Sequence, residues 1–192
     1  MTLDNNKKIF LLVIRFCDAE YSFICNLVPR ISKEGLITSY RVFYRIQIGL
    51  NIIDRPILEL INNKIGNLGK IYDYPNKKES TLSITTHENM KIMIENVFSK
   101  YPLLTSYQAT RDEKLRKGLT ENITKVKSIE EFKFLMYGSN NIEEKIINPK
   151  FEDYSNFLLD YWLVGFLNGE VSFTYFKGKK GNLKPKVSLL VN

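Results

Sequence analysis

The chain has 192 residues, of which 44% are hydrophobic and 12% aromatic. This composition predicts a globular protein with a genuine core and excludes a disordered chain. The formal net charge of +7 indicates an acidic partner, nucleic acid before an anionic membrane surface. No apolar run approaches the roughly 20 residues of a membrane span.

The pattern begins with a helix over residues 6–19, because apolar residues recur there on one stripe at helical spacing. This helix ends at Glu20. Two strands are predicted next, over residues 21–30 and 39–51, joined by a polar turn that contains a glycine. The sequence therefore predicts a hairpin directly after the first helix.

The second of these strands alternates between two kinds of side chain. Arg41, Arg45 and Gln47 point to one side, whereas Val42 to Ile48 supply an apolar opposite side. Such a sheet packs helices on its apolar face and can present the other face to phosphates and base edges. The bland alternative is a solvated outer face, which is usual in antiparallel sheets.

Further elements follow in order along the chain. The pattern predicts a helix from Asp54 to Gly66, strands over residues 70–74 and 81–86, a helix from Thr86 or His87 to Phe98, and helices over residues 107–119 and 128–137. The polar, irregular segment 138–153 is the predicted linker.

A second unit follows this linker. It is predicted to contain a helix over residues 154–169 and strands over residues 171–176 and 184–191. Lysines crowd this hairpin and could lie along a phosphate backbone; they include Lys180, Lys184 and Lys186.

The start of the first unit is repeated in the second. Residues 13–23 (VIRFCDAEYSF) and 162–173 (WLVGFLNGEVSF) share an apolar run, a small residue, a lone carboxylate and Ser-Phe. Each carboxylate, Glu20 or Glu170, falls at a helix C-terminus, where a negative charge is unfavourable. If the two helices pack side by side, a divalent cation best relieves the repulsion between the acids. Alternatively, each acid is an exposed helix-end residue.

At these residues the sequence resembles the LAGLIDADG homing endonucleases, in the WLAGFIDGEGSF form of organellar intron-encoded members. The matching residues of the second copy are Leu163, Gly165, Phe166, Gly169, Glu170, Ser172 and Phe173. Between the motifs, FYRIQIGLNIIDRPILELI, GNLGKIYDY and KYPLLTSYQA are similar in wording and order to the first repeat of that family.

The resemblance implies an α+β fold of αββαββα repeats with a saddle-shaped antiparallel sheet. The first repeat would cover residues 1–137, and residues 154–192 would form an incomplete second repeat. The resemblance implies a mitochondrial, site-specific endonuclease for double-stranded DNA. The protein would have no membrane partner and, if full length, would be a monomer with two pseudo-symmetric halves. Glu20 and Glu170 would bind Mg²⁺, and Gln47 would help to place water. Contacts with DNA would come from Arg41, Arg45, Gln47, Lys180, Lys184 and Lys186.

The chain departs from the family pattern at several positions. Arg15 replaces a small residue of the helix contact, and Tyr21 and Val171 replace the glycine after each acid. Ser106 and Tyr107 stand where many members carry lysine. Two alternatives therefore remain beside the nuclease: an intron RNA maturase of the same fold, and an inactive truncated relic.

Overall fold

The computed structural model of the protein describes residues 19–138, 146–149, 160, 163–164, 167, 171–177 and 183–189. The chain divides into two compact units, Tyr21–Lys150 and Met1–Glu20 with Phe151–Asn192. Most of the predicted first helix, most of the linker, and the residues Glu170 and Lys180 lie outside the described residues. The repeat boundaries predicted from the sequence stay a prediction.

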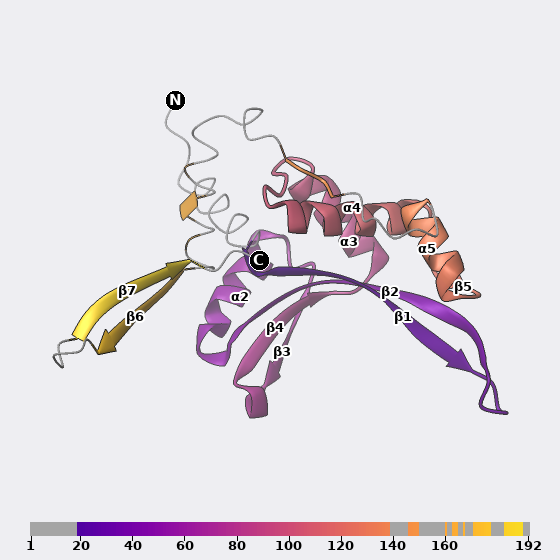
Figure 1. Cartoon of the computed structure of the whole chain (residues 1–192), viewed down its shortest axis with the longest axis horizontal. Helices are drawn as coiled ribbons and strands as arrows, with labels where there is room; N and C mark the ends of the chain where they lie inside the picture. Colours follow the sequence, from indigo (N-terminus) through magenta and orange to yellow (C-terminus); the bar gives the residue numbers. More distant parts are fainter. Residues whose placement is uncertain are drawn as a thin grey trace. The chain divides into compact units, whose positions relative to one another are not determined.

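An antiparallel sheet forms the larger unit (Figure 1). Its strands are β1 (Tyr21–Ile31), β2 (Ile37–Asn51), β3 (Lys70–Tyr74) and β4 (Glu79–Ile84), in the order β1-β2-β4-β3. A short strand, β5 (Lys125–Val126), pairs with β2 at Tyr40 and Arg41. Both predicted strand pairs are confirmed. β5 was not predicted, because two residues carry no periodic pattern.

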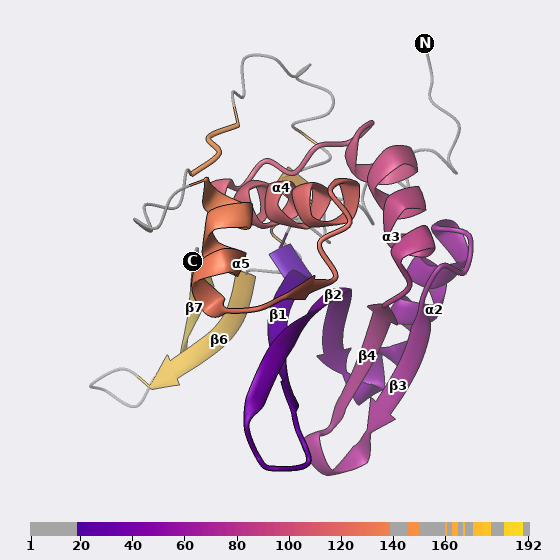
Figure 2. The same ribbon diagram turned by 90° about the vertical axis from the view of Figure 1, so that its right-hand side faces the viewer.

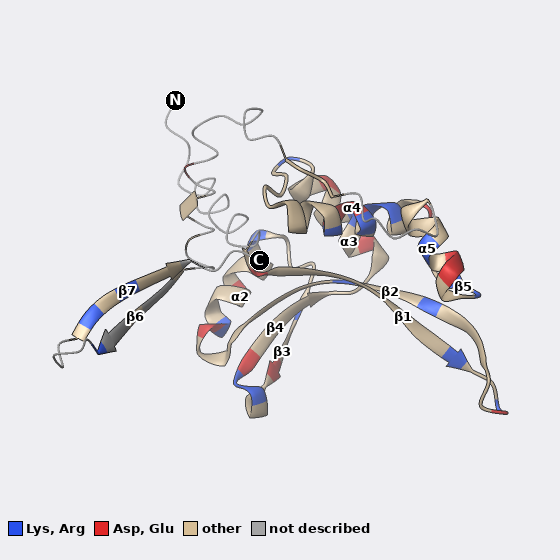
Figure 3. Ribbon diagram, in the orientation of Figure 1, with Lys and Arg blue, Asp and Glu red and all other residues tan. Residues whose placement is uncertain are grey.

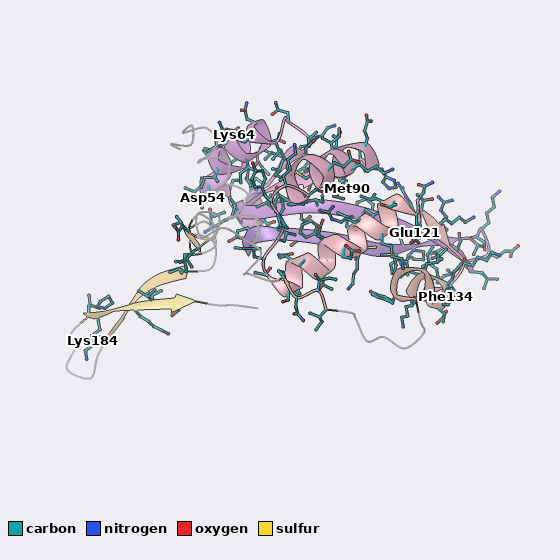
Figure 4. All side chains as sticks on the ribbon, turned by 90° about the horizontal axis from the view of Figure 1, so that it is seen from above. Asp54, Lys64, Met90, Glu121, Phe134 and Lys184 are labelled. Carbon is teal, nitrogen blue, oxygen red and sulfur yellow. The ribbon has the colours of Figure 1, made fainter. Side chains whose placement is uncertain are left out.

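Helices cover one face of this sheet and leave the other open (Figures 1 and 2). They are α2 (Arg55–Lys64), α3 (His87–Met93) with a π-helical turn at Ile94–Phe98, α4 (Ser106–Thr120) and α5 (Ile129–Tyr137). Seen from above, α4 crosses the strands obliquely (Figure 4). The described order of strands and helices confirms the predicted α+β fold and the ββαββα part of the repeat that follows the motif helix.

The core lies between the sheet and the helices. Val42, Tyr44, Ile46 and Ile48 of β2 are at most 3% exposed, which confirms the predicted alternation. The helices contribute the other half of this layer, including Leu58, Ile61, Met90, Met93, Leu115 and Leu119. Burial of this apolar surface is the main stabilising term of the unit.

Helix starts differ in part from the sequence prediction. Asp54 occupies the N-cap position of α2 but makes no capping hydrogen bond. Instead, the Asn51 side chain accepts a hydrogen bond from the Ile53 amide in the preceding 3-10 turn (3.1 Å). α4 begins at Ser106, one residue before its predicted start, and the Thr105 hydroxyl caps it by accepting from the Gln108 amide (3.4 Å).

The smaller unit contains a two-stranded antiparallel sheet of β6 (Val171–Lys177) and β7 (Leu183–Leu189). Both predicted strands are confirmed within a few residues. Residues 183–187 of β7 are all exposed. Asp160, Leu163, Val164 and Leu167 are helical. Within the described parts of the chain, no helix is long and apolar enough to cross a membrane.

Candidate nucleic-acid interface

The sheet face that the helices leave uncovered carries half of the predicted DNA-contacting residues, namely Arg41, Arg45 and Gln47. We call the open face the side formed by alternate residues of β1 and β2, paired across the hairpin: Ser22 with Gln47, Ile24 with Arg45, Asn26 with Phe43, and Val28 with Arg41. Lys and Arg occur along this ribbon and at the β3–β4 turn (Figure 3). The open face therefore combines cations, amides and hydroxyls, which suit phosphate contacts and base-edge readout.

Arg45 is held in a defined position on the open face. Its guanidinium lies 4.9 Å from the centre of the Phe43 ring, and Nη1 donates to Gln47 Oε1 over 3.4 Å. Arg45 Nε is buried and has no hydrogen-bond partner within the described residues. Arg41, further along the same strand, is exposed. The structure thus brings Arg41, Arg45 and Gln47 to one face, as the alternation predicts.

The open face continues onto β4 and β3. Ser83 lies beside Gln47, and Lys70 pairs with Ser83. Tyr72 and Tyr74 follow at every second residue of β3 and are 45% and 44% exposed. These tyrosines were not among the predicted site residues, although the alternation in KIYDY places them on one face of the strand. They add aromatic surface, which can pack against bases or sugars.

Glu20 is the last helical residue before β1 and is half-buried. Gln47, proposed from the resemblance to place water, pairs with Ser22, the second residue of β1. The next residue after Glu20 is also tied down, because Gln108 Nε2 donates to the Tyr21 carbonyl oxygen over 2.6 Å. The chain is therefore fixed from two directions directly after Glu20.

A carboxylate such as Glu20 offers the oxygen ligands that Mg²⁺ prefers. In the described stretches of the chain, no three His, Cys, Asp or Glu side chains gather in one place. A Mg²⁺ site does not need such a cluster, because this ion keeps several waters and commonly takes one or two carboxylates together with substrate phosphates. Glu20 fits a site of that kind as one of its protein ligands.

The hairpin of the smaller unit repeats the register of β1 and β2. Phe173 pairs with Val187 as Phe23 pairs with Ile46, each three residues after the motif acid. By this register Lys186 corresponds to Arg45 and Ser188 to Gln47. Lys184 and Lys186 are exposed, two residues apart on β7. The internal repeat therefore extends beyond the motif into the second strand, which sequence comparison alone did not detect.

A cavity of about 250 Å³ lies on the helix-covered side, between β1, α4 and α5. Its lining includes Cys25, Arg111, Lys114 and Tyr137. Burial raises the pKa of the Cys25 thiol to about 11, although Lys114 acts in the opposite direction. At neutral pH this thiol is protonated and is a poor nucleophile. The cavity reaches Ile24 and Asn26 of the edge strand β1, which also belong to the open face, but most of its lining comes from the helix-covered side.

Residues 16–112 match the sequence profile of a family described as LAGLIDADG endonuclease. No curated protein sequence matches the chain. Among solved structures, the chain is similar to the LAGLIDADG meganuclease I-CpaMI bound to uncleaved DNA, with 21% identity and a TM-score of 0.64 over 93% of this chain and 65% of that one. It is also similar to the LAGLIDADG homing endonuclease I-GzeII in complex with its DNA target, with 24% identity and a TM-score of 0.61 over 93% of this chain and 64% of that one.

A third similar structure is I-SmaMI bound to an uncleaved DNA target in the presence of calcium ions, with 21% identity and a TM-score of 0.60 over 97% of this chain and 66% of that one. At these identities the likeness shows a shared fold. The chain spans about 65% of the length of the solved proteins that it matches.

Proposed function

Because the chain belongs to the LAGLIDADG endonuclease family, we propose that it is a site-specific endonuclease for double-stranded DNA that uses a divalent cation. The observation that carries this proposal is the open face, where Arg41, Arg45 and Gln47 lie together on an uncovered antiparallel sheet. The similar proteins I-CpaMI and I-GzeII were solved bound to DNA, which supports the choice of ligand.

The open face would act in two ways. Arg41 and Arg45 would neutralise phosphates and release counterions, which supplies affinity without reading sequence. The Gln47 amide, which both donates and accepts hydrogen bonds, suits a base edge or a water molecule beside the scissile phosphate. Lys184 and Lys186 would extend the phosphate contacts to a second stretch of duplex, and we include Lys180 in this set.

Glu20 would hold Mg²⁺ together with Glu170, its counterpart in the sequence repeat. A bound cation would supply neutralisation of phosphate charge and a more acidic water. The chain itself contributes the ligand carboxylate, the fixed backbone after it, and Gln47 as the residue that orients water. From family habit we also propose a mitochondrial, intron-encoded origin and, for a full-length protein, a monomer with two pseudo-symmetric halves.

One observation favours a second function, an intron RNA maturase of the same fold. At the start of α4 the positions where the resemblance expects lysine hold Ser106, which donates to Asn148 Oδ1 (3.0 Å), and Tyr107, which lies 4.3 Å from the Arg111 guanidinium. Neither side chain carries the cation expected beside the scissile phosphate. A basic sheet would then bind folded RNA without cleaving DNA.

The decisive experiment is cleavage, by the purified 192-residue chain, of a duplex that carries the uninterrupted host-gene junction. We expect cleavage with Mg²⁺ and none with EDTA. Glu20→Gln should lose at least roughly 100-fold in cleavage rate while still binding the duplex in Ca²⁺. Glu88→Gln, which removes an exposed acid from the first turn of α3, is the matched control and should cleave normally.

Other results would contradict the nuclease in different ways. Duplex binding without cleavage, together with tighter binding of the intron RNA, would favour the maturase. An aggregated chain that binds neither nucleic acid would favour the inactive relic. Equal cleavage by Glu20→Gln and the unaltered chain would remove Glu20 from the site.

A further inference from the structure

Gln108 is a buried amide that connects two distant parts of the larger unit. It lies in the first turn of α4 and is 5% exposed. Its Nε2 donates to the Tyr21 carbonyl oxygen over 2.6 Å, across 87 residues of sequence. Its Oε1 is buried and has no hydrogen-bond partner within the described residues. Most buried polar atoms in proteins are hydrogen-bonded, so an amide that uses only its donor calls for an explanation.

The helix that carries Gln108 is itself firmly placed. Gly118 lies against the Tyr44 ring so closely that a Cβ there would come within 2.3 Å of Tyr44 Oη. Tyr44 Oη in turn donates to the Ile123 carbonyl oxygen over 2.8 Å, just beyond the end of α4. Leu115 and Leu119 of α4 are buried. Gln108 therefore lies on a well-packed helix and can hold a neighbouring segment in place by a hydrogen bond.

Gln108 holds the start of β1, where the chain passes from the helix that ends at Glu20 into the sheet. Tyr21 is the first residue of β1 and pairs with Ile48 at the end of the ladder. β1 is an edge strand of the described sheet, so its first residue has a strand neighbour on one side. Gln108 supplies a hydrogen bond from α4 at the same residue. Tyr21 directly follows Glu20, and the peptide between them links the helix end to the sheet.

We propose that Gln108 is a positioning residue for the Glu20 carboxylate, acting through the Tyr21 carbonyl. This inference rests on the proposed role of Glu20 as a metal ligand. A ligand carboxylate must be held within about half an ångström of its working position. Fixing the residue that follows Glu20 limits the directions in which the helix end can swing. Supporting residues of this kind typically change metal affinity by about 10–100-fold.

A purely stabilising role explains Gln108 less well. A methionine would fill a similar volume at this position without burying an unpaired acceptor, since its side chain is apolar and adaptable. What methionine cannot do is donate a hydrogen bond to the Tyr21 carbonyl oxygen. The unpaired Oε1 is thus the consequence of keeping that single donor.

The test compares Gln108→Met with Thr110→Val. Thr110 is also 5% exposed and on α4, and its hydroxyl donates to the Ser106 carbonyl (2.7 Å) and accepts from the Ile147 amide (2.9 Å). It has no hydrogen bond to β1 among those described. Two quantities are measured: the Mg²⁺ concentration for half-maximal cleavage, and amide hydrogen exchange at Tyr21 and Ser22 in metal-free protein.

For Gln108→Met we expect a roughly tenfold higher Mg²⁺ requirement, nearly unchanged cleavage at saturating Mg²⁺, and faster exchange at Tyr21 and Ser22. Thr110→Val should lower the melting temperature and leave both quantities as in the unaltered chain. Gln108→Leu, which also lacks a donor, should behave like Gln108→Met and serves if the methionine variant does not fold.

The outcomes separate this inference from the proposed function. Unchanged exchange at Tyr21 and Ser22 in Gln108→Met overturns it, whether or not the chain cleaves DNA. An unchanged Mg²⁺ requirement in a chain that cleaves also overturns it. If the unaltered chain does not cleave, Mn²⁺ binding is measured by EPR on the unaltered chain and both variants. Weaker Mn²⁺ binding in Gln108→Met alone then supports the positioning role while the endonuclease proposal fails, and equal binding rejects both.

Discussion

The two hairpins of this protein share one register and have very different surroundings. Ile46 of β2, paired with Phe23, is 0% exposed, whereas its counterpart Val187 of β7, paired with Phe173, is 64% exposed. β2 has β4 and β5 on its second edge and helices over its apolar face. In the described part of the chain, β7 pairs only with β6.

The difference separates what a short sequence specifies from what the rest of the chain must supply. The Ser-Phe after each acid opens a strand in both places, so local pattern is enough for the hairpin. Burial of that hairpin depends on elements that follow it, from α2 to α4. A two-stranded hairpin alone is at best marginally stable in water, so β6 and β7 need further packing to be stable.

The largest expected effect tests this contrast directly. Ile46→Ala should destabilise the larger unit by about 2–5 kcal/mol, because it leaves a cavity in a fully packed core. Val187→Ala should change the free energy of unfolding by less than about 0.5 kcal/mol, because the side chain is exposed. Urea unfolding of both variants measures this. Similar losses for the two would mean that β7 is buried against a partner in solution.

A second variant breaks the packing between α4 and β2. Gly118→Ala should cost about 1–3 kcal/mol, because the new methyl group would overlap the Tyr44 ring, whose nearest atoms would lie 2.3–2.6 Å from it. Gly49→Ala is the control: its Cβ would meet the Glu79 carboxylate at 3.1 Å, and that end of the side chain can move. Thermal unfolding compares them, and an unaltered midpoint for Gly118→Ala would disprove the close contact.

A DNA-binding measurement tests whether the β6–β7 hairpin contacts phosphates as the β1–β2 hairpin is proposed to do. Arg41→Ala and Lys186→Ala should each lower the slope of log affinity against log salt by about 1, since each removes one phosphate contact. Lys91→Ala removes an equal charge from α3 on the helix-covered side and should leave the slope unchanged. The slopes come from duplex binding titrations at several salt concentrations. A normal slope for Lys186→Ala would confine binding to β1 and β2.

The smallest expected effect concerns pH. Burial raises the pKa of the Asp112 carboxyl despite the nearby Arg116. The folded state therefore favours the protonated acid, so this residue's contribution to stability is greatest below the unfolded pKa of 3.8 and is lost as pH rises through the raised value. Relative to Asp112→Asn, the unaltered chain should lose stability over that window and show a constant difference above it.

Asp73 provides the opposite sign as a control for that measurement. The Ser80 hydroxyl and Arg55 lower the pKa of the Asp73 carboxyl. Its small contribution is therefore present above 3.8 and lost as pH falls through the lowered value. Urea unfolding of Asp112→Asn and Asp73→Asn, from acid to neutral pH, should give differences that change in opposite directions. Parallel curves for Asp112→Asn and the unaltered chain would show that the Asp112 carboxyl is not perturbed.

Much of the fold could be predicted because its elements carry their own pattern. Alternation in β2 placed Arg41, Arg45 and Gln47 on one face, and helical spacing identified α2 and α3. The predicted start of α4 at residue 107 lies one residue after the observed start at Ser106, which the Thr105 side chain caps. The roles of Glu170 and Lys180, which lie outside the described residues, stay predictions.

The parts that could not be predicted depend on contacts between distant residues. Nothing near Gln108 in sequence indicates that its amide reaches Tyr21, and the two residues of β5 have no period. The shared face of Tyr72 and Tyr74 could have been predicted, since every second residue of β3 points to the same side. Local pattern thus indicated the strands and helices. The contacts that fix the chain directly after Glu20 could be found only in the structure.

The long-range hydrogen bonds of Tyr21 and Tyr44 also determine when the fold can be completed during synthesis. Tyr44 Oη donates a hydrogen bond to the carbonyl oxygen of Ile123, 79 residues further along the chain. The Tyr21 carbonyl oxygen accepts one from Gln108, 87 residues further along. A ribosome that adds roughly 5–20 residues per second releases the β1–β2 hairpin several seconds before Gln108 and Ile123. During that interval the apolar face of β2 is uncovered. The nascent chain therefore passes through a stage in which chaperone binding would compete with premature association.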